Sequence, residues 1–246
     1  MADGSLAIVG IGPGDYAVVT HRAAEVLRSV GVIVGYEGYV ELVRAWLPEQ
    51  RYAASPITHE IERAEEAVDR ACAGERVALI GSGDAGIYGL AGLALQILAE
   101  RDAADLPVEV VAGVTAATSA AALLGAPLGH DFAVISLSDL LTPWEVIRRR
   151  LVAAAEADFA TVLYNPASQR RRTQLEEARQ IFLRWRAPQT PVGLVTQAYR
   201  SGQRLSLATL ATFEPSEAGM LTTVVIGNSA TFRWRDRLIT PRGYRP

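Results

Sequence analysis

The sequence contains no lysine, since all 24 of its basic residues are arginine. This absence excludes a lysine Schiff base, and with it ordinary pyridoxal-phosphate catalysis, as well as the lysine that P-loop enzymes place against phosphate. Cysteine is almost as rare, because Cys72 is the only one. A single cysteine excludes disulfides within the chain, cysteine-rich zinc sites and iron–sulfur clusters held by the protein.

Histidines are too few and too scattered to suggest a metal site, since His21, His59 and His130 lie far apart in the sequence. The segment HEIER at 59–63 matches the zinc-binding pattern H-E-x-x-H only in part, because Arg63 occupies the position of the second histidine. We therefore expect no protein-bound metal.

Long hydrophobic runs and an excess of basic charge are also absent. No stretch approaches 18 uninterrupted apolar residues, so no membrane-spanning segment is expected. The first residues, MADGSLAIVG, lack the basic region and the apolar run of a secretory signal, which makes the cytoplasm the expected location. The net charge of −3 gives no general attraction to nucleic acid or to an anionic membrane, so neither is an expected partner.

The residues that are present predict an α/β fold. Short runs rich in Val and Ile predict buried strands in the first half, namely SLAIVG, GVIVGY, RVALIG and VEVVAG. Helical periodicity predicts helices over 20–30 and 61–72, with Thr20 as an N-cap and Cys72 packed on an apolar face. Strands that alternate with helices predict a mostly parallel sheet covered on both sides.

The segment GAPLGHD interrupts this pattern and predicts a domain junction at residues 125–131. We expect an N-terminal α/β domain over 1–124 and a C-terminal α/β domain over 132–246. Helices are predicted over 143–157 and 170–185, and strands in FAVISL, FATVLYNP, PVGLVTQA, RLSLATLAT, LTTVVIGN and TFRWRDRLI. The later strands leave little room for helices, so the C-terminal sheet is expected to be mixed.

Candidate binding residues lie in three strand-to-helix turns of the first half. The first turn, GIGPGD at 10–15, is similar to the dinucleotide fingerprint G-x-G-x-x-G. However, Asp15 stands at the sixth position, where its charge would repel a pyrophosphate, and Pro13 removes a backbone donor from the turn. A nicotinamide cofactor with Glu37 on its ribose, and a tight turn that binds nothing, both remain alternatives.

The second turn, within LIGSGDAGIYGLAGL at 79–93, brings Ser82, Gly83 and Asp84 to the end of a buried strand. Open parallel sheets bind ligands at that edge, although a helix N-cap is the alternative role for Asp84. In the third turn, AGVTAA, Thr115 and Ala116 stand at a strand-to-helix boundary, where an ordinary helix cap is the alternative.

Together these turns resemble the tetrapyrrole (corrin/porphyrin) methylase family, whose members use S-adenosylmethionine (SAM). The resemblance runs from IVGIGPGD through GSGDAGIY, GVTA and VLYNP to LTTVVIGN, which is nearly the whole chain. One departure is Ala112, where the family usually has proline before GVTA. The resemblance implies a two-domain fold, with SAM and substrate in the cleft between the domains, and a homodimer.

Site residues follow from the same resemblance. SAM carries a sulfonium cation and no phosphate, so a proline in the first turn and nearby carboxylates are compatible with it. Asp15 is expected on the substrate side. The positions that match the family's SAM contacts are Pro13, Ser82, Gly83, Asp84, Ile87, Thr115, Ala116, Asn165 and Ala198.

The blocks GAPLGHDFAVISLSDLLTPWEVI and LYNPASQRRRTQL are similar to family members that methylate C17 of precorrin-3B and contract its ring to precorrin-4 in cobalamin biosynthesis. A precorrin carries acetate and propionate groups, which arginine binds well. The candidate partners are Arg170, Arg171 and Arg172, which are expected in the first turn of a helix. The helix dipole disfavours cations there unless an anion offsets them. The run at 148–150 is interpreted as a solvated helix face.

His130 is the candidate base for the ring contraction, with a structural hydrogen-bonding role as the alternative. Within the family, methylation at C11 or C20 and a cobalt-containing substrate of the anaerobic route remain alternatives. Outside the family, the alternatives are an NAD(P)-dependent oxidoreductase and a non-catalytic tetrapyrrole-binding protein. The absence of a DNA-binding motif argues against a sensor.

Overall fold

The computed structural model describes residues 4–244, and its contacts divide the chain into two compact units between Thr115 and Ala116. Within the described residues, no helix combines the length and the apolar character needed to cross a membrane. The two units are described in turn.

The N-terminal unit is a five-stranded sheet in the order β3-β2-β4-β1-β5, and every neighbouring pair is parallel. This confirms the predicted α/β class and the parallel sheet. The elements are β1 (Ser5–Gly10), η1 (Tyr16–Val18), α1 (His21–Ser29), β2 (Val32–Tyr36), α2 (Glu37–Arg44), β3 (Tyr52–Ser55), α3 (Glu60–Cys72), β4 (Arg76–Gly81), α4 (Ala91–Glu100) and β5 (Val108–Val111).

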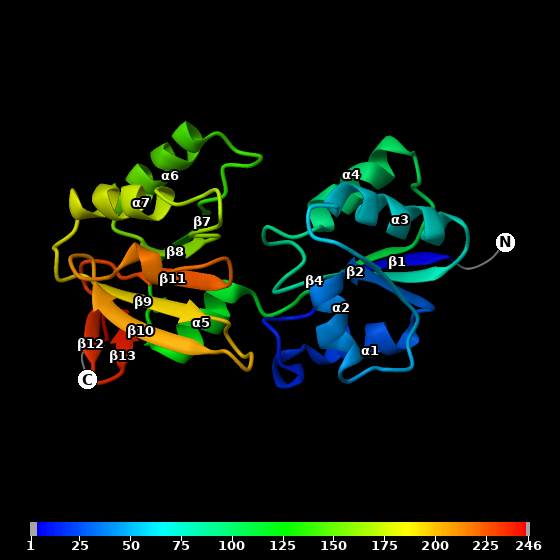
Figure 1. Ribbon diagram of the computed structural model, residues 1–246, viewed down its shortest axis with the longest axis horizontal. Coiled ribbons are helices and arrows are strands. Elements are labelled where there is room, and N and C mark those ends of the chain that lie inside the picture. The colour runs from blue at the N-terminus through cyan, green and yellow to red at the C-terminus, as the bar shows by residue number, and fades with distance from the viewer. Residues whose placement is uncertain (1–3, 245–246) are drawn as a thin grey trace. The chain divides into compact units, whose positions relative to one another are not determined.

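Helices cover both faces of this sheet, with α3 and α4 on one face and α1 and α2 on the other (Figure 1). The Thr20 side chain accepts a hydrogen bond from the Ala23 N–H, which confirms it as the N-cap of α1. Cys72, however, is exposed, so its predicted packing is wrong. The buried side of α3 passes through Ala71, and Cys72 is turned about 100° from it, away from the sheet.

The C-terminal unit has a second five-stranded sheet in the order β10-β9-β11-β8-β7 and a small sheet in the order β12-β13-β6. Only β7 and β8 pair in parallel within the larger sheet, which confirms the predicted mixed sheet. The elements are α5 (Ala116–Leu124), β6 (Gly125–Ala126), β7 (Phe132–Ser136), α6 (Trp144–Glu156), β8 (Ala160–Tyr164), α7 (Gln174–Leu183), β9 (Pro191–Thr196), β10 (Arg204–Thr209), η2 (Pro215–Glu217), β11 (Thr222–Ile226), β12 (Phe232–Trp234) and β13 (Arg237–Ile239).

The helix α5 belongs to this second unit, and that explains where the chain divides. Ala117, Ala120 and Leu124 pack against Val162 and Val225 of the larger sheet, on the face opposite α6 and α7 (Figure 1). The division after Thr115 therefore precedes α5, and it differs from the junction expected at 125–131. That segment instead begins with β6, which pairs with β13, and its proline and second glycine follow this strand.

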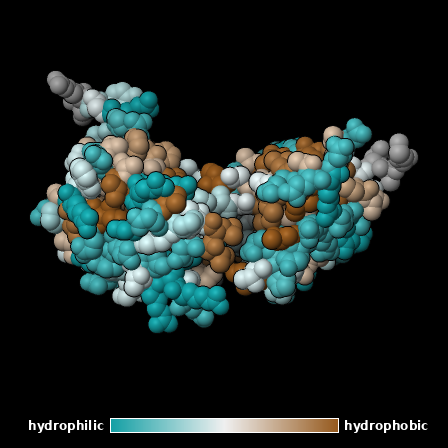
Figure 2. Space-filling view, turned by 90° about the horizontal axis from the view of Figure 1, so that it is seen from above, coloured by the Kyte–Doolittle hydropathy of each residue, from teal (hydrophilic) through white to brown (hydrophobic). Residues whose placement is uncertain are grey.

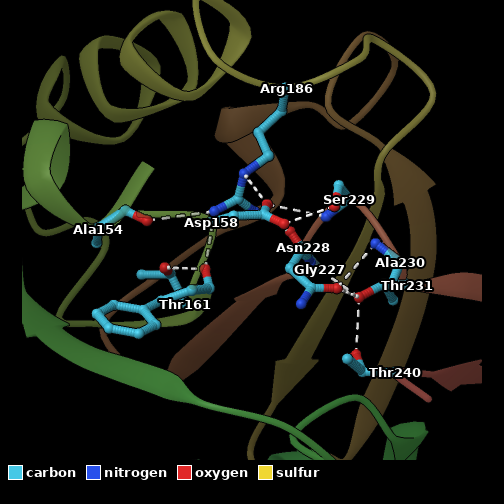
Figure 3. A network of polar contacts seen from close by, with 11 residues as sticks. Ala154, Asp158, Thr161, Arg186, Gly227, Asn228, Ser229, Ala230, Thr231 and Thr240 are labelled. Carbon is cyan, nitrogen blue, oxygen red and sulfur yellow. Dashed lines mark hydrogen bonds and ion pairs between the residues drawn. The ribbon is translucent and has the colours of Figure 1, made fainter. Parts of the chain in front are cut away.

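A buried arginine ties several parts of the C-terminal unit together (Figure 3). The Arg186 side chain is 1% exposed, and its Nε lies 3.0 Å from Asp158 Oδ1. Its terminal nitrogens donate to the carbonyl oxygens of Gly227, Ala154 and Phe159. Burial lowers the pKa of Arg186, and the Asp158 carboxylate opposes that shift. A buried guanidinium without partners would strongly destabilise the fold, and these contacts offset that cost.

Hydrophilic residues cover much of each unit on the face shown in Figure 2, with apolar residues gathered in smaller areas between them. Large apolar side chains that are exposed include Leu95 of α4, Leu140 and Leu141 after β7, and Trp234 of β12. Single exposed apolar side chains are common in globular proteins, so these residues do not by themselves mark a binding surface.

Candidate functional site

The first and second glycine turns of the N-terminal unit bind each other. They follow β1 and β4, which are neighbours in the parallel sheet. Gly12 N donates to Gly83 O at 3.0 Å, and Gly83 N donates to Gly12 O at 2.8 Å, so the two residues form an antiparallel bridge. Gly12 has a φ of 72°, a left-handed conformation that glycine adopts without strain.

The third turn, after β5, closes on the same point. A Cβ atom added to Gly113 would lie 2.0 Å from Gly83 O and 2.6 Å from Gly10 O. A Cβ atom added to Gly10 would lie 2.6 Å from Gly83 O. The three turns therefore need glycine because their backbones touch, and we call Gly10, Gly12, Gly83 and Gly113 the glycine junction.

Asp84 fastens this junction with its side chain. Its Oδ1 accepts a hydrogen bond from Gly86 N at 2.8 Å, and its Oδ2 accepts one from Gly113 N at 2.9 Å. The helix that follows begins only at Ala91, with Leu90 as its N-cap, so Asp84 is not a helix cap. Its carboxylate joins the second turn to the third.

These bonds bear on the dinucleotide alternative. A phosphate cradle needs backbone N–H groups directed at the ligand. In this structure the N–H groups of Gly12, Gly83 and Gly113 already donate to acceptors of the protein. Asp15 adds negative charge at the first turn, where its carboxylate accepts from Ala17 N and caps η1. The arrangement does not support pyrophosphate binding.

The other predicted residues of the N-terminal unit surround the junction. Pro13 is buried in the first turn, and Ser82 is half-buried with its Oγ 3.5 Å from Gly12 O. Ile87 is 40% exposed beyond Asp84, and Thr115 is half-buried at the end of the unit. Glu37, the alternative ribose partner, is exposed at the start of α2.

The C-terminal unit concentrates strained backbone at one sheet edge. The strands β7, β8 and β9 all end there, since β7 is parallel to β8 and β11 is antiparallel to both β8 and β9. Asn165, after β8, has a φ of 51°, and Gln197 and Tyr199, after β9, have φ values of 51° and 57°. Non-glycine residues in this conformation cluster at functional sites. Ala198, predicted to contact SAM, is half-buried between two of them.

Tyr164 is a residue of this edge that the sequence analysis missed. Its hydroxyl accepts a hydrogen bond from Ala117 N at 2.6 Å, within the first turn of α5. The tyrosine therefore fixes the start of α5, where Ala116 is half-buried, to the end of β8, where Asn165 follows. The signal was visible in LYNP, but only the fold brings α5 to that strand.

The three arginines at 170–172 do not open a helix, so that prediction is wrong. The helix α7 begins at Gln174, and the arginines lie in the preceding loop, where Ser168 and its neighbours hydrogen-bond within the loop. The argument from the helix dipole therefore fails. Arg170 and Arg172 are exposed, whereas the Arg171 side chain is only 12% exposed. In the other run, Arg148 pairs with Glu145, and 149–150 are exposed, as expected of a solvated face.

His130 lies at the opposite edge of the larger sheet from Asn165. It precedes β7, whose five residues span about 16 Å, whereas Asn165 follows the parallel strand β8. The histidine is 51% exposed in its side chain, and it lines a surface pocket with Asp158, Asn228 and Arg242. Its Nδ1 accepts from Asp131 N at 2.8 Å. This placement supports the structural role, and it does not support a base acting beside Asn165.

No group of three or more His, Cys, Asp or Glu side chains placed to hold a metal ion occurs within residues 4–244. The arrangement defines a class: a two-unit α/β protein whose candidate residues lie at strand ends in each unit, around interlocked glycine turns in the N-terminal unit and beside left-handed residues in the C-terminal unit. A model of the tetrapyrrole (corrin/porphyrin) methylases matches residues 5–214. The chain belongs to that family.

Curated relatives cover nearly all of this chain. A cobalt-factor III methyltransferase of Priestia megaterium is 48% identical over 98% of the chain, and this chain spans about half of that protein, 45% of its length. A probable cobalt-factor III C(17)-methyltransferase of Salmonella typhimurium is 45% identical, and the match covers 97% of this chain and 99% of the relative. A precorrin-3B C(17)-methyltransferase of Sinorhizobium is 39% identical, covering 93% and 90% of the two chains.

A solved structure agrees with these relatives. The crystal structure of the methyltransferase CobJ matches with a TM-score of 0.90 and 34% identity, and the match covers 97% of this chain and all of the other. The similarity extends over both units, so the α/β fold with its parallel and mixed sheets is that of a known methyltransferase.

Proposed function

We propose that this protein transfers a methyl group from SAM to C17 of a precorrin-3B-type tetrapyrrole, with contraction of the ring, in cobalamin biosynthesis. The support is the full-length match to a relative named for C17 methylation at 45% identity. Two relatives named for cobalt-factor III are 48% and 45% identical, and a relative named for precorrin-3B is 39% identical. Both the cobalt-containing and the cobalt-free substrate therefore belong in the test.

The glycine junction fits SAM better than a dinucleotide, and this observation carries the choice of cofactor. The backbone donors of Gly12, Gly83 and Gly113 are already used, and carboxylates stand at positions 15 and 84. A sulfonium nucleoside needs no phosphate cradle and tolerates nearby negative charge. When bound, SAM supplies an electrophilic methyl group to the electron-rich ring carbon.

The chain's own residues hold and orient the two reactants. In the N-terminal unit the proposed SAM contacts are Pro13, Ser82, Gly83, Asp84, Ile87 and Thr115, and in the C-terminal unit Ala116, Asn165 and Ala198. The leaving thioether is neutral and needs no proton, so positioning supplies much of the acceleration. Asp15 stays on the proposed substrate side. For the substrate carboxylates we keep Arg170 and Arg172, which are exposed, and we withdraw His130 as the base.

Incubation of the purified protein with methyl-labelled SAM tests the proposal. One arm receives precorrin-3B and the other receives cobalt-factor III, and mass spectrometry follows label and ring contraction. Methylated, ring-contracted product in either arm supports the proposal, and the productive arm identifies the substrate. If both small molecules bind and no label moves, the protein is a carrier and the proposal fails. Methylation at C11 or C20 would reassign the position.

A thermal-shift comparison separates the proposal from the oxidoreductase alternative. SAM or S-adenosylhomocysteine is expected to raise the melting temperature, because a ligand that binds only the folded state stabilises it by mass action. NAD(P) is expected to leave it unchanged. The reverse result would overturn the choice of cofactor.

We also propose a cytoplasmic homodimer, as the family resemblance implies, and light scattering on the purified protein tests the dimer.

A further inference from the structure

The structure separates Arg171 from the two arginines beside it. Its side chain is 12% exposed, while Arg170 and Arg172 are exposed. Arg171 Nη1 donates to the backbone carbonyl of Asn165 at 3.1 Å, and its Nη2 donates to Ser138 Oγ at 3.0 Å. One guanidinium therefore joins the loop after β8 to the loop after β7, which a side chain turned to solvent would not do.

Asn165 is held a second time, through its side chain. Its Nδ2 donates to Ser136 Oγ at 3.0 Å, at the end of β7. On the far side of the guanidinium, Arg171 Nε lies 3.7 Å from Asp139 Oδ1, and Gln174 Nε2 donates to Asp139 Oδ2 at 2.9 Å. The contacts form a continuous network from the end of β7 to the start of α7, in which Arg171 links Asn165, Ser138 and Asp139.

The backbone of Asn165 needs this support. Its φ of 51° is a left-handed conformation, which asparagine adopts more readily than most residues but still at a higher cost than glycine. Pro166 follows it, and the residue before a proline prefers extended backbone. Two preferences therefore oppose the observed conformation, and such a conformation persists only where the surroundings fix it.

We infer that Arg171 is a positioning residue: it holds Asn165 in its left-handed conformation for SAM binding, and it leaves substrate carboxylates to Arg170 and Arg172. The inference rests on the proposed function, because it takes Asn165 as a SAM contact. It divides three adjacent arginines, alike in sequence, into one that acts through a neighbour and two that meet the substrate.

The first test is Arg171→Lys, with calorimetry to measure the Kd for SAM and steady-state kinetics to measure the KM for the tetrapyrrole. Lysine keeps the charge but has one nitrogen, so it cannot reach both Asn165 O and Ser138 Oγ as the planar guanidinium does. We expect SAM binding to weaken about tenfold, and the tetrapyrrole KM at saturating SAM to stay within about twofold. Arg170→Gln and Arg172→Gln should do the reverse. Arg149→Gln, on the exposed face of α6, is the matched control and should change neither value.

A double-mutant cycle with Asn165→Gly distinguishes positioning from a general loss of stability. Glycine takes the left-handed conformation without strain, so a support for it matters less. In the Asn165→Gly background, Arg171→Lys should therefore weaken SAM binding by less than about threefold, with melting temperatures measured for all four proteins. If the two changes are additive in the Kd for SAM, or if Arg171→Lys changes only the melting temperature, the inference is overturned.

Failure of the proposed function would look different. If the unaltered protein binds no SAM, the proposed function is overturned and the inference with it. If the unaltered protein binds SAM and transfers methyl groups while Arg171→Lys binds it equally well, the proposed function stands and the inference alone is overturned. A rise in the tetrapyrrole KM for Arg171→Lys, with SAM affinity unchanged, would move Arg171 back to the substrate side.

Discussion

The strand ends of the N-terminal unit are held mainly by contacts between backbone atoms, to which the Asp84 carboxylate adds, whereas those of the C-terminal unit are held by side chains. In the first unit, Gly12 and Gly83 bond reciprocally and Gly113 packs between backbones with no room for a Cβ. In the second, Tyr164, Arg171 and Asn165 reach across neighbouring segments. We therefore expect substitutions that add a side-chain atom to destabilise the N-terminal unit most, and substitutions that remove a side chain to destabilise the C-terminal unit most.

The largest effect is expected from one added methyl group in the N-terminal unit. In Gly113→Ala the Cβ would lie 2.0 Å from Gly83 O, a backbone atom that cannot rotate away. We expect a loss of about 4 kcal/mol or more in the free energy of unfolding, above the usual cost of overpacking because the clash is with backbone. Thermal denaturation and soluble yield measure it.

The matched control is Gly92→Ala, at an exposed position of α4 where an added Cβ meets nothing within 4 Å. Alanine favours a helix over glycine by up to about 1 kcal/mol, so this variant should be as stable as the original protein or more stable. If Gly113→Ala tolerated the methyl group as Gly92→Ala does, the glycine junction would not be a close backbone contact.

A removed side chain should have the next largest effect, in the C-terminal unit. Arg186→Ala takes the hydrogen-bond donors from Gly227 O, Ala154 O and Phe159 O and leaves Asp158 without its cation. Because three carbonyl groups lose their donor and a fully buried side chain is truncated, we expect a loss of about 3 kcal/mol. Urea unfolding measures the loss, and Arg184→Ala, two residues away and exposed, is the control. Equal effects of the two variants would contradict the structural role of the buried network.

The contrast also explains how much of the fold the sequence could predict. Strands such as β1 and β4 are continuous apolar runs bounded by glycine, and α1 carries its own N-cap in Thr20, so local patterns suffice for them. Local patterns did not predict β3 or α2. The strand β3 is the short YAAS segment without a buried run, and α2 follows β2 directly, with no capping hydrogen bond from Tyr36.

The part of the candidate site that consists of glycine turns could be predicted from the sequence, whereas the part that depends on contacts between side chains could be predicted less well. The glycine turns were recognised, but not their bonds to each other, because the Gly12–Gly83 pairing joins distant segments of the chain. Nothing local separates Arg171 from Arg170, since only the loop after β7 gives it partners. His130 was predicted near the site from its position in the sequence, whereas the length of β7 separates it from the strand ends beside Asn165.

A single changed atom in Asp84 tests the link between the second and third turns. In the unaltered protein Gly86 N donates to one carboxylate oxygen of Asp84 and Gly113 N donates to the other. In Asp84→Asn one of these oxygens becomes an NH₂ group, which faces one of the two N–H donors. The substitution removes one charge-assisted hydrogen bond and leaves two N–H donors facing each other. We expect it to lower the free energy of unfolding by about 2 kcal/mol. SAM affinity should fall together with stability. Asp105→Asn, at an exposed position, is the control, and an equal melting temperature for both would exclude the link.

The smallest effect is expected where a side-chain pair joins exposed elements of the N-terminal unit. Arg22 donates to both oxygens of Glu109, at 2.8 and 2.7 Å, which ties α1 to β5. The hydrogen bond from Arg22 lowers the pKa of Glu109, although burial opposes it. A lowered carboxyl pKa means that this stabilisation is present above the ordinary pKa and is lost as the pH falls through the folded-state value.

Because both side chains are exposed, Glu109→Gln should lower the melting temperature by about 1–2 °C at neutral pH. The difference should shrink as the pH falls below the ordinary glutamate pKa, vanish once Glu109 itself is protonated in the folded protein, and shrink in high salt. Exposed Glu49→Gln is the control, and a difference that persisted in acid would show that packing of the side chain, rather than its charge, holds α1 to β5.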